Sequence, residues 1–204
     1  MGKFNANLCN VTPIDLNFLL YVHNVYLNLN TEQIRFPGRY PGGDTIGFLP
    51  YEHFVDTMKK NWEQILSAYN QNICREIETL QMDRYASWFT DDAHGRRTLQ
   101  DLWDAFNLWW WPDYGIRQFM DRISDPCVPV IGDQLSRMAR DAGYAISNDQ
   151  LALLMVFDKP PAQFKRQDRR VYVACLAEIL RSDMTLIARS MFDNLIAPVP
   201  PGWQ

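Results

Sequence analysis

The chain has 204 residues, of which 47% are apolar, 13% aromatic and 22% charged, and its formal net charge is −4. This composition excludes extensive disorder, because it supplies enough apolar surface to bury a core, and the length suits one large domain or two closely packed small ones. The acidic charge argues against nucleic-acid binding, since phosphate contacts require a basic field. It favours a cytoplasmic protein and is compatible with a basic partner.

The cysteines predict neither a disulfide framework nor a zinc site. Cys9, Cys74, Cys127 and Cys175 are widely spaced and form no CxxC pair, so we expect four reduced thiols. The most apolar early segment, residues 18–22, is too short for a signal peptide or a membrane span. We therefore expect a soluble, cytoplasmic protein that binds no membrane and needs no cofactor.

The first predicted helix follows an extended stretch of residues 1–11. Thr12 can act as its N-cap, Pro13 suits the first helical position, and Asp15 places negative charge in the first turn. Apolar residues then cover nearly the whole circumference as far as Leu29. Such a helix is typical of the interior of a bundle.

Residues 30–50 hold four of the ten glycines and three of the twelve prolines. Glycine costs about 1 kcal/mol and proline about 3 kcal/mol inside a helix, so this segment is predicted to be a long loop. It lacks the lysine and Ser/Thr pair of a phosphate-binding loop, which argues against a nucleotide site. Long loops often carry function, and Arg39, Tyr40 and Asp44 are therefore candidate partner-binding residues.

Helical periodicity predicts further helices over residues 51–69, 73–89, 98–110 and 116–123. The first of these has an apolar stripe formed by Phe54, Met58, Trp62, Ile65, Leu66 and Tyr69. Residues 90–97 form a polar break, after which Thr98 and Asp101 resemble a capping box. Pro112 either ends the helix that they start or begins the next one.

The last third of the chain is predicted to be helical over residues 131–142, 151–157 and 168–197. Gly143 suits the end of the first of these helices, and Ser147 with Gln150 forms a capping box for the second. A bend near residues 182–183 is compatible with the third. Residues 197–204 are predicted to be extended, which leaves Trp203 available for docking.

No strand-like alternation longer than a few residues is present, and no repeat of fixed period is found. The sequence therefore predicts an all-α protein. We expect residues 1–204 to form a single helical domain, a compact bundle of about seven or eight helices with one long Gly/Pro-rich loop.

Two groups of polar residues are candidates for metal or acid–base chemistry. Asp91, Asp92 and His94 cluster in the polar break, where carboxylates and an imidazole could hold a divalent cation; the alternative is a solvated loop. His23 lies on the first helix, near Asn17, Asn24 and Asn28 in sequence. A buried, hydrogen-bonded cluster is favoured there over a metal site, because no acidic residue shares the face of His23.

The most unusual segment contains Trp109, Trp110 and Trp111, followed by Tyr114. Consecutive residues of a helix are about 100° apart, so the three indoles cannot all face one core. At least one of them must face solvent, cover a loop or contact a partner. Trp and Tyr dominate the binding hot spots of protein interfaces, and these four residues are candidate partner-binding residues.

No motif for nucleophilic catalysis is present. The interpretation that we favour is a non-enzymatic protein-binding module, an inhibitor or immunity-type protein that neutralises a partner protein. The alternative is a helical enzyme or a small-ligand or metal-binding protein that uses Asp91, Asp92 and His94.

Overall fold

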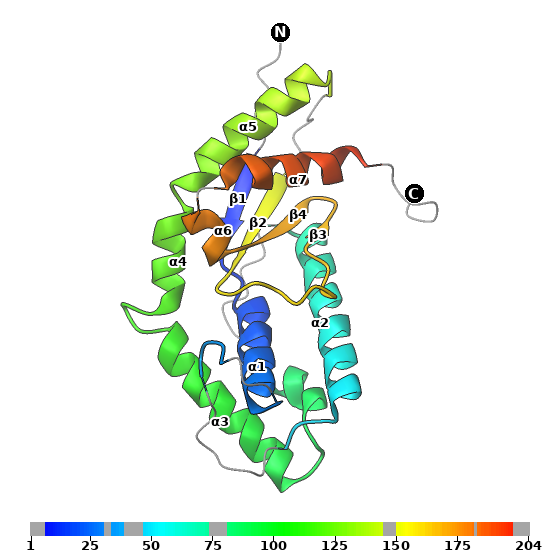
Figure 1. Ribbon diagram of the computed structural model, residues 1–204, viewed down its shortest axis with the longest axis vertical. Coiled ribbons are helices and arrows are strands. Elements are labelled where there is room, and N and C mark those ends of the chain that lie inside the picture. Colours follow the sequence, from blue (N-terminus) through cyan, green and yellow to red (C-terminus); the bar gives the residue numbers. More distant parts are fainter. Residues whose placement is uncertain are drawn as a thin grey trace.

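The computed structural model describes residues 7–30, 34–38, 47–73, 81–144, 150–181 and 183–197 (Figure 1). Its centre is a four-stranded sheet in the order β1-β2-β4-β3. The strands are β1 (Asn7–Val11), β2 (Gln150–Val156), β3 (Gln167–Asp168) and β4 (Val171–Cys175). Strands β1, β2 and β4 are parallel, and β3 is antiparallel to β4. The predicted all-α class is therefore wrong, and the fold is α/β.

Helices surround this sheet and make up most of the described chain. They are α1 (Ile14–Asn30), α2 (Tyr51–Gln71), η1 (Met82–Trp88, a 3-10 helix), α3 (Ala93–Trp110), α4 (Ile116–Ser124), α5 (Cys127–Asp141), α6 (Leu176–Leu180) and α7 (Met184–Ile196). In Figure 1, β1 leads directly into α1, which runs beside α2, while α7 lies across the other end of the strands next to α5. None of the helices that the structure describes combines the length and the apolarity that crossing a bilayer requires.

Strand β2 is buried on both faces, and this explains why its sequence was misread as a helix. Leu151, Leu153 and Met155 belong to one apolar cluster, which includes residues of α5 and α7. The alternate residues Ala152, Leu154 and Val156 belong to another, with residues of α1, α2 and α3. Because both faces are covered, the strand is a continuous apolar run without the alternation of a half-exposed strand.

The other two parallel strands also occupy segments that were predicted differently. β1 lies within residues 1–11, which were expected to be extended without a partner, and it pairs with β2 in the register Leu8 to Leu151. β4 lies within the predicted helix 168–197, and α6 and α7 form only after it ends. Its sequence, VYVAC, is rich in the β-branched and aromatic residues that favour strands.

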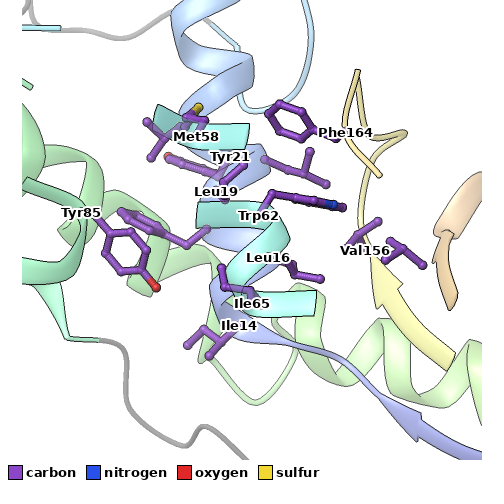
Figure 2. Packing of buried hydrophobic residues seen from close by; sticks show 14 of the residues in the cluster. Ile14, Leu16, Leu19, Tyr21, Met58, Trp62, Ile65, Tyr85, Val156 and Phe164 are labelled. Carbon is purple, nitrogen blue, oxygen red and sulfur yellow. The ribbon is translucent and has the colours of Figure 1, made fainter. Parts of the chain in front are cut away.

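The larger apolar cluster lies where α1, α2 and η1 meet the sheet (Figure 2). Trp62 of α2 is fully buried, between Leu16 and the side chains of Val156 and Phe164. Its indole N–H donates to the carbonyl oxygen of Lys165 over 2.5 Å, so this polar atom is satisfied. Tyr85 of η1 is also buried in this cluster, with 1% of its surface exposed.

Several predicted helices are confirmed. α1 is buried around nearly its whole circumference, and the buried side chains of α2 are the six of the predicted stripe. α4 matches the predicted helix 116–123 within one residue. α5 begins four residues earlier than predicted, at Cys127. Within the helix predicted over 73–89, residues 82–88 form the 3-10 helix η1, and residues 74–80 lie outside the described residues.

Candidate functional site

The candidate site is the turn that joins α3 to α4. Pro112 cannot continue the ladder of helical hydrogen bonds, so α3 ends at Trp110. The backbone N–H of Gly115 donates to the carbonyl oxygen of Pro112 over 2.6 Å and closes the turn. A Cβ atom at Gly115 would lie 2.6 Å from the carbonyl oxygen of Trp110, so only glycine fits this close approach.

The three tryptophans point in different directions, as the helical spacing predicts. Trp110 is buried, with 1% of its surface exposed, and stacks on Phe106 at a centroid distance of 5.2 Å. Trp109 is half-buried and covers Phe36 and Phe157, at 4.7 and 4.9 Å. Trp111 is 42% exposed. In the folded chain, Trp110 can only support the surface from beneath, whereas Trp111 is part of it.

The indole of Trp111 is held in one orientation by its neighbours. Its N–H donates to the side-chain oxygen of Asn107 over 3.0 Å. The guanidinium of Arg117 lies over the ring, 5.2 Å from the centroid, as a cation–π contact. An aromatic side chain that is fixed before binding loses little conformational entropy on contact with a partner.

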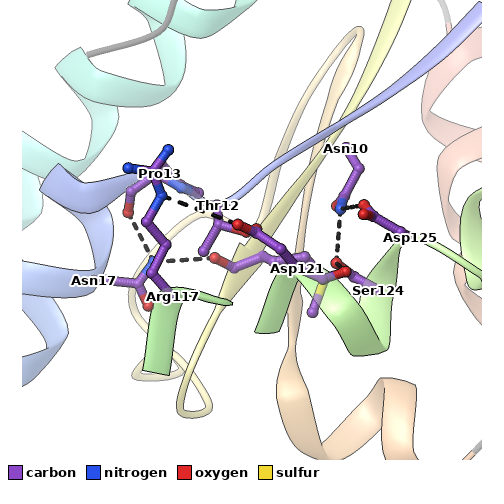
Figure 3. A network of polar contacts seen from close by, with 9 residues as sticks. Asn10, Thr12, Pro13, Asn17, Arg117, Asp121, Ser124 and Asp125 are labelled. Atoms are coloured by element: carbon purple, nitrogen blue, oxygen red, sulfur yellow. Dashed lines mark hydrogen bonds and ion pairs between the residues drawn. The ribbon is translucent and has the colours of Figure 1, made fainter. Parts of the chain in front are cut away.

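Helix α4, which carries Arg117, is itself fixed to the end of β1 by polar contacts (Figure 3). Thr12 donates its hydroxyl hydrogen to Asp121, which connects the segment before α1 to α4. The side-chain amide of Asn10 donates to Ser124 over 2.6 Å and to Asp125 over 2.9 Å. The turn before α4 is therefore built on a rigid support.

We call Leu108, Trp111 and Tyr114 the corner surface. Leu108 is 78% exposed and lies one turn before Trp111 on α3, while Tyr114 in the turn is 93% exposed. Leu108 was not singled out from the sequence, although an apolar residue on an otherwise polar helix face was the available signal. Exposed carboxylates lie close in sequence, with Asp104 one turn before Leu108 and Asp113 next to Tyr114.

The other half of the predicted binding surface, Arg39, Tyr40 and Asp44, lies outside the described residues. The described part of that loop, residues 34–38, is held against α1. Asn28 contributes most of these contacts, because its amide donates to the carbonyl oxygens of Arg35 and Gly38, both over 2.7 Å.

Asp91 and Asp92 directly precede α3, and their carboxylates make contacts that stabilise the start of this helix. Asp92 is the N-cap of α3, because its carboxylate accepts the backbone N–H of Gly95 over 2.8 Å. This hydrogen bond, with a second one from Thr90, holds the pKa of Asp92 below its usual value. Asp91 forms an exposed ion pair with Arg96 at 3.6 Å, and His94 is exposed.

Across the described ranges, no three His, Cys, Asp or Glu side chains are grouped so that they could hold a metal ion. Of the cysteines in the described ranges, Cys9, Cys127 and Cys175, none forms a disulfide. Burial raises the pKa of the Cys175 thiol, which disfavours the thiolate form that a nucleophile needs.

The polar residues of α1 form a buried, hydrogen-bonded group, as the sequence favours. Asn17, Asn24 and Asn28 are almost fully buried, and each donates a side-chain hydrogen bond. His23 is 3% exposed, and its ring lies 5.7 Å from that of Phe164. Burial lowers the pKa of His23 to about 4, so the imidazole is neutral at pH 7.

Comparison with known proteins gives no relatives: no family model, no curated protein and no solved structure matches this chain.

Proposed function

We propose that this chain is a protein-binding module that contacts its partner through the corner surface. The observation that carries the proposal is the exposure of Leu108, Trp111 and Tyr114 at 78%, 42% and 93% on a rigid turn. Large aromatic residues of this kind, surrounded by polar residues, form the centres of protein interfaces.

The charges around the corner surface favour a basic partner. Among the described residues, neither Asp104 nor Asp113 has a cation within ion-pairing distance, whereas Arg117 pairs with Asp121 at 4.0 Å. The free negative charge therefore lies beside the aromatic residues. The net charge of −4 has the same sign and would accelerate encounter with a basic protein.

The finer proposal is that binding neutralises the partner, as in inhibitor or immunity-type proteins. A rigid aromatic centre with acidic neighbours is suited to covering a basic active surface, such as one that binds anionic substrates. This role requires only tight binding and no chemistry on the part of the chain. It is tested by the partner's activity, which should fall in proportion to the fraction bound.

Replacing either Trp111 or Tyr114 with alanine should weaken the complex by at least about 30-fold, because a hot-spot residue contributes about 2 kcal/mol or more, and replacing both should weaken it further. The partner is identified by affinity capture from the native host and mass spectrometry, and the Kd is then measured with each purified variant. Leu108→Ala should weaken binding to a smaller extent. The fold should persist, since both aromatic side chains are substantially exposed.

Matched controls distinguish the loss of a side chain from the corner surface from the loss of any exposed apolar side chain. Tyr51→Ala removes an aromatic ring that is 53% exposed on α2, and Leu186→Ala removes a leucine that is 65% exposed on α7. Asp104→Asn with Asp113→Asn should slow association more than Asp133→Asn with Asp193→Asn, which changes the net charge by the same amount. Equal affinity of the Trp111/Tyr114 variant and the wild type would refute the proposal.

A further inference from the structure

A second surface feature lies at the carboxyl end of β2 and contains none of the corner-surface residues. Residues 34–36 and 157–162 line a groove of about 550 Å³. This volume lies within the range of small-molecule sites. In α/β sheets, ligands bind outside the carboxyl ends of the parallel strands, which is where residues 157–162 emerge from the sheet.

The two walls of the groove are joined beneath by the buried amide of Asn24. It donates to the carbonyl oxygen of Phe36 over 3.0 Å and to the carboxylate of Asp158 over 2.7 Å. Asn28 fixes Arg35, because its side-chain oxygen accepts the backbone N–H of Arg35 over 2.7 Å. The groove is therefore formed before any ligand binds, which lowers the entropic cost of binding.

One end of the groove is aromatic. Phe36 is 49% exposed, and its ring lies 5.9 Å from that of Phe157, edge to face. Both rings pack on Trp109, which supports them from the protein side. Exposed aromatic faces of this kind favour contact with another planar ring.

The charges of the groove favour an anion. Arg35 and Lys159 both line it, and neither has an ion-pair partner within the described part of the chain. The one carboxylate in the lining, that of Asp158, accepts hydrogen bonds from Asn24 and from the backbone of Lys159. Two cations against one carboxylate leave a net positive charge.

We propose that this groove binds a small organic anion with a planar aromatic body. The ring lies against Phe36 and Phe157, and the anionic group, a carboxylate, sulfonate or phosphate, pairs with Arg35 and Lys159. The groove shares no lining residue with the corner surface, so either one can exist without the other.

The test uses two fluorescent probes of similar shape, the anionic 8-anilinonaphthalene-1-sulfonate and the neutral N-phenyl-1-naphthylamine. The sulfonate should bind saturably with one site per chain. Arg35→Gln with Lys159→Gln should raise its Kd about tenfold and change the Kd of the neutral probe less than twofold. Phe36→Ala should weaken both probes.

Lys59→Gln with Lys60→Gln on the outer face of α2 is the control for charge, and Trp111→Ala is the control for binding at the corner surface; neither should change either Kd. If the double groove variant loses its circular dichroism signal, Lys159→Gln alone should still raise the sulfonate Kd about threefold. The proposal is overturned by binding that does not saturate, or by a sulfonate Kd that is insensitive to the groove variants. A response to Trp111→Ala would also overturn it.

Discussion

Replacing Asn17 with leucine is expected to lower the free energy of unfolding by about 4 kcal/mol, because it leaves two buried backbone groups without a partner. Asn17 is fully buried on α1. Its amide donates to the carbonyl oxygen of Met155 over 3.0 Å, and its side-chain oxygen accepts the backbone N–H of Phe157 over 2.9 Å. One side chain therefore joins the first helix to the end of the central strand. Chemical denaturation at pH 7 measures the change.

Two further variants show whether these hydrogen bonds account for the loss. Asn194→Leu removes one exposed hydrogen bond, to the carbonyl oxygen of Arg169, and should cost less than about 1 kcal/mol. Asn17→Asp places a carboxylate against the carbonyl oxygen of Met155, and its deficit relative to the wild type should shrink as the pH falls and the carboxyl becomes a donor. If Asn17→Leu lowers the free energy of unfolding by less than about 1 kcal/mol, Asn17 does not join α1 to the end of β2 in the way described.

Acidification is expected to destabilise the chain through His23. The pKa of this imidazole is about 4 in the folded chain, mainly because burial disfavours the charged form, whereas the ordinary pKa of histidine is 6.5. The unfolded chain therefore binds a proton more readily than the folded chain. The contribution of the neutral imidazole to the free energy of unfolding is fully present above pH 6.5. It is lost as the pH falls toward 4, and the total loss is about 3 kcal/mol.

The contribution of His23 is isolated by comparison with His23→Gln, which has no titratable group at this position. Other acidic groups titrate in both proteins and cancel in the difference, among them Glu178, whose pKa is lowered by Arg166 despite its partial burial. The free energy of unfolding is measured by denaturation from pH 7 to pH 4. Parallel pH profiles for the two proteins would show that His23 is not buried in its neutral form.

The sequence predicts the long helices well, and fails for the short strands that are buried on both faces. The stripe of α2 repeats every three to four residues, and this period has only a helical explanation. β2 contains a short apolar run, LALLMV, whose two faces are both covered, so periodicity cannot distinguish a strand from a buried helix. Its pairing with β1 joins distant parts of the chain, and no local pattern encodes it.

The start of α3 was misplaced for a related reason. Gly95 lowers the helix propensity of residues 93–97, so the predicted helix began at Thr98. The structure needs glycine at this position, since a Cβ atom there would lie 1.9 Å from the carbonyl oxygen of Thr90. The hydroxyl of Thr98 accepts the backbone N–H of Gly47 over 3.0 Å instead of capping the helix. The close packing of Gly47 and Gly95 is a tertiary feature that propensities do not contain.

The candidate site could be predicted in part. The 100° step between helical residues shows that Trp109, Trp110 and Trp111 diverge. Which of them faces solvent depends on partners that come from distant segments, such as Phe36 and Phe157 around Trp109. Only the structure could identify Trp111 as the exposed indole.

Hydroxyl-radical footprinting of the chain, free and bound to its captured partner, tests the central claim most directly. In the free chain, Trp111 and Tyr114 should be oxidised rapidly because both side chains are exposed. In the complex, their oxidation should fall at least fivefold, while that of Tyr51 should stay within twofold of its free value. Unchanged oxidation of Trp111 and Tyr114 at saturating partner would place the interface elsewhere and contradict the role of the corner surface.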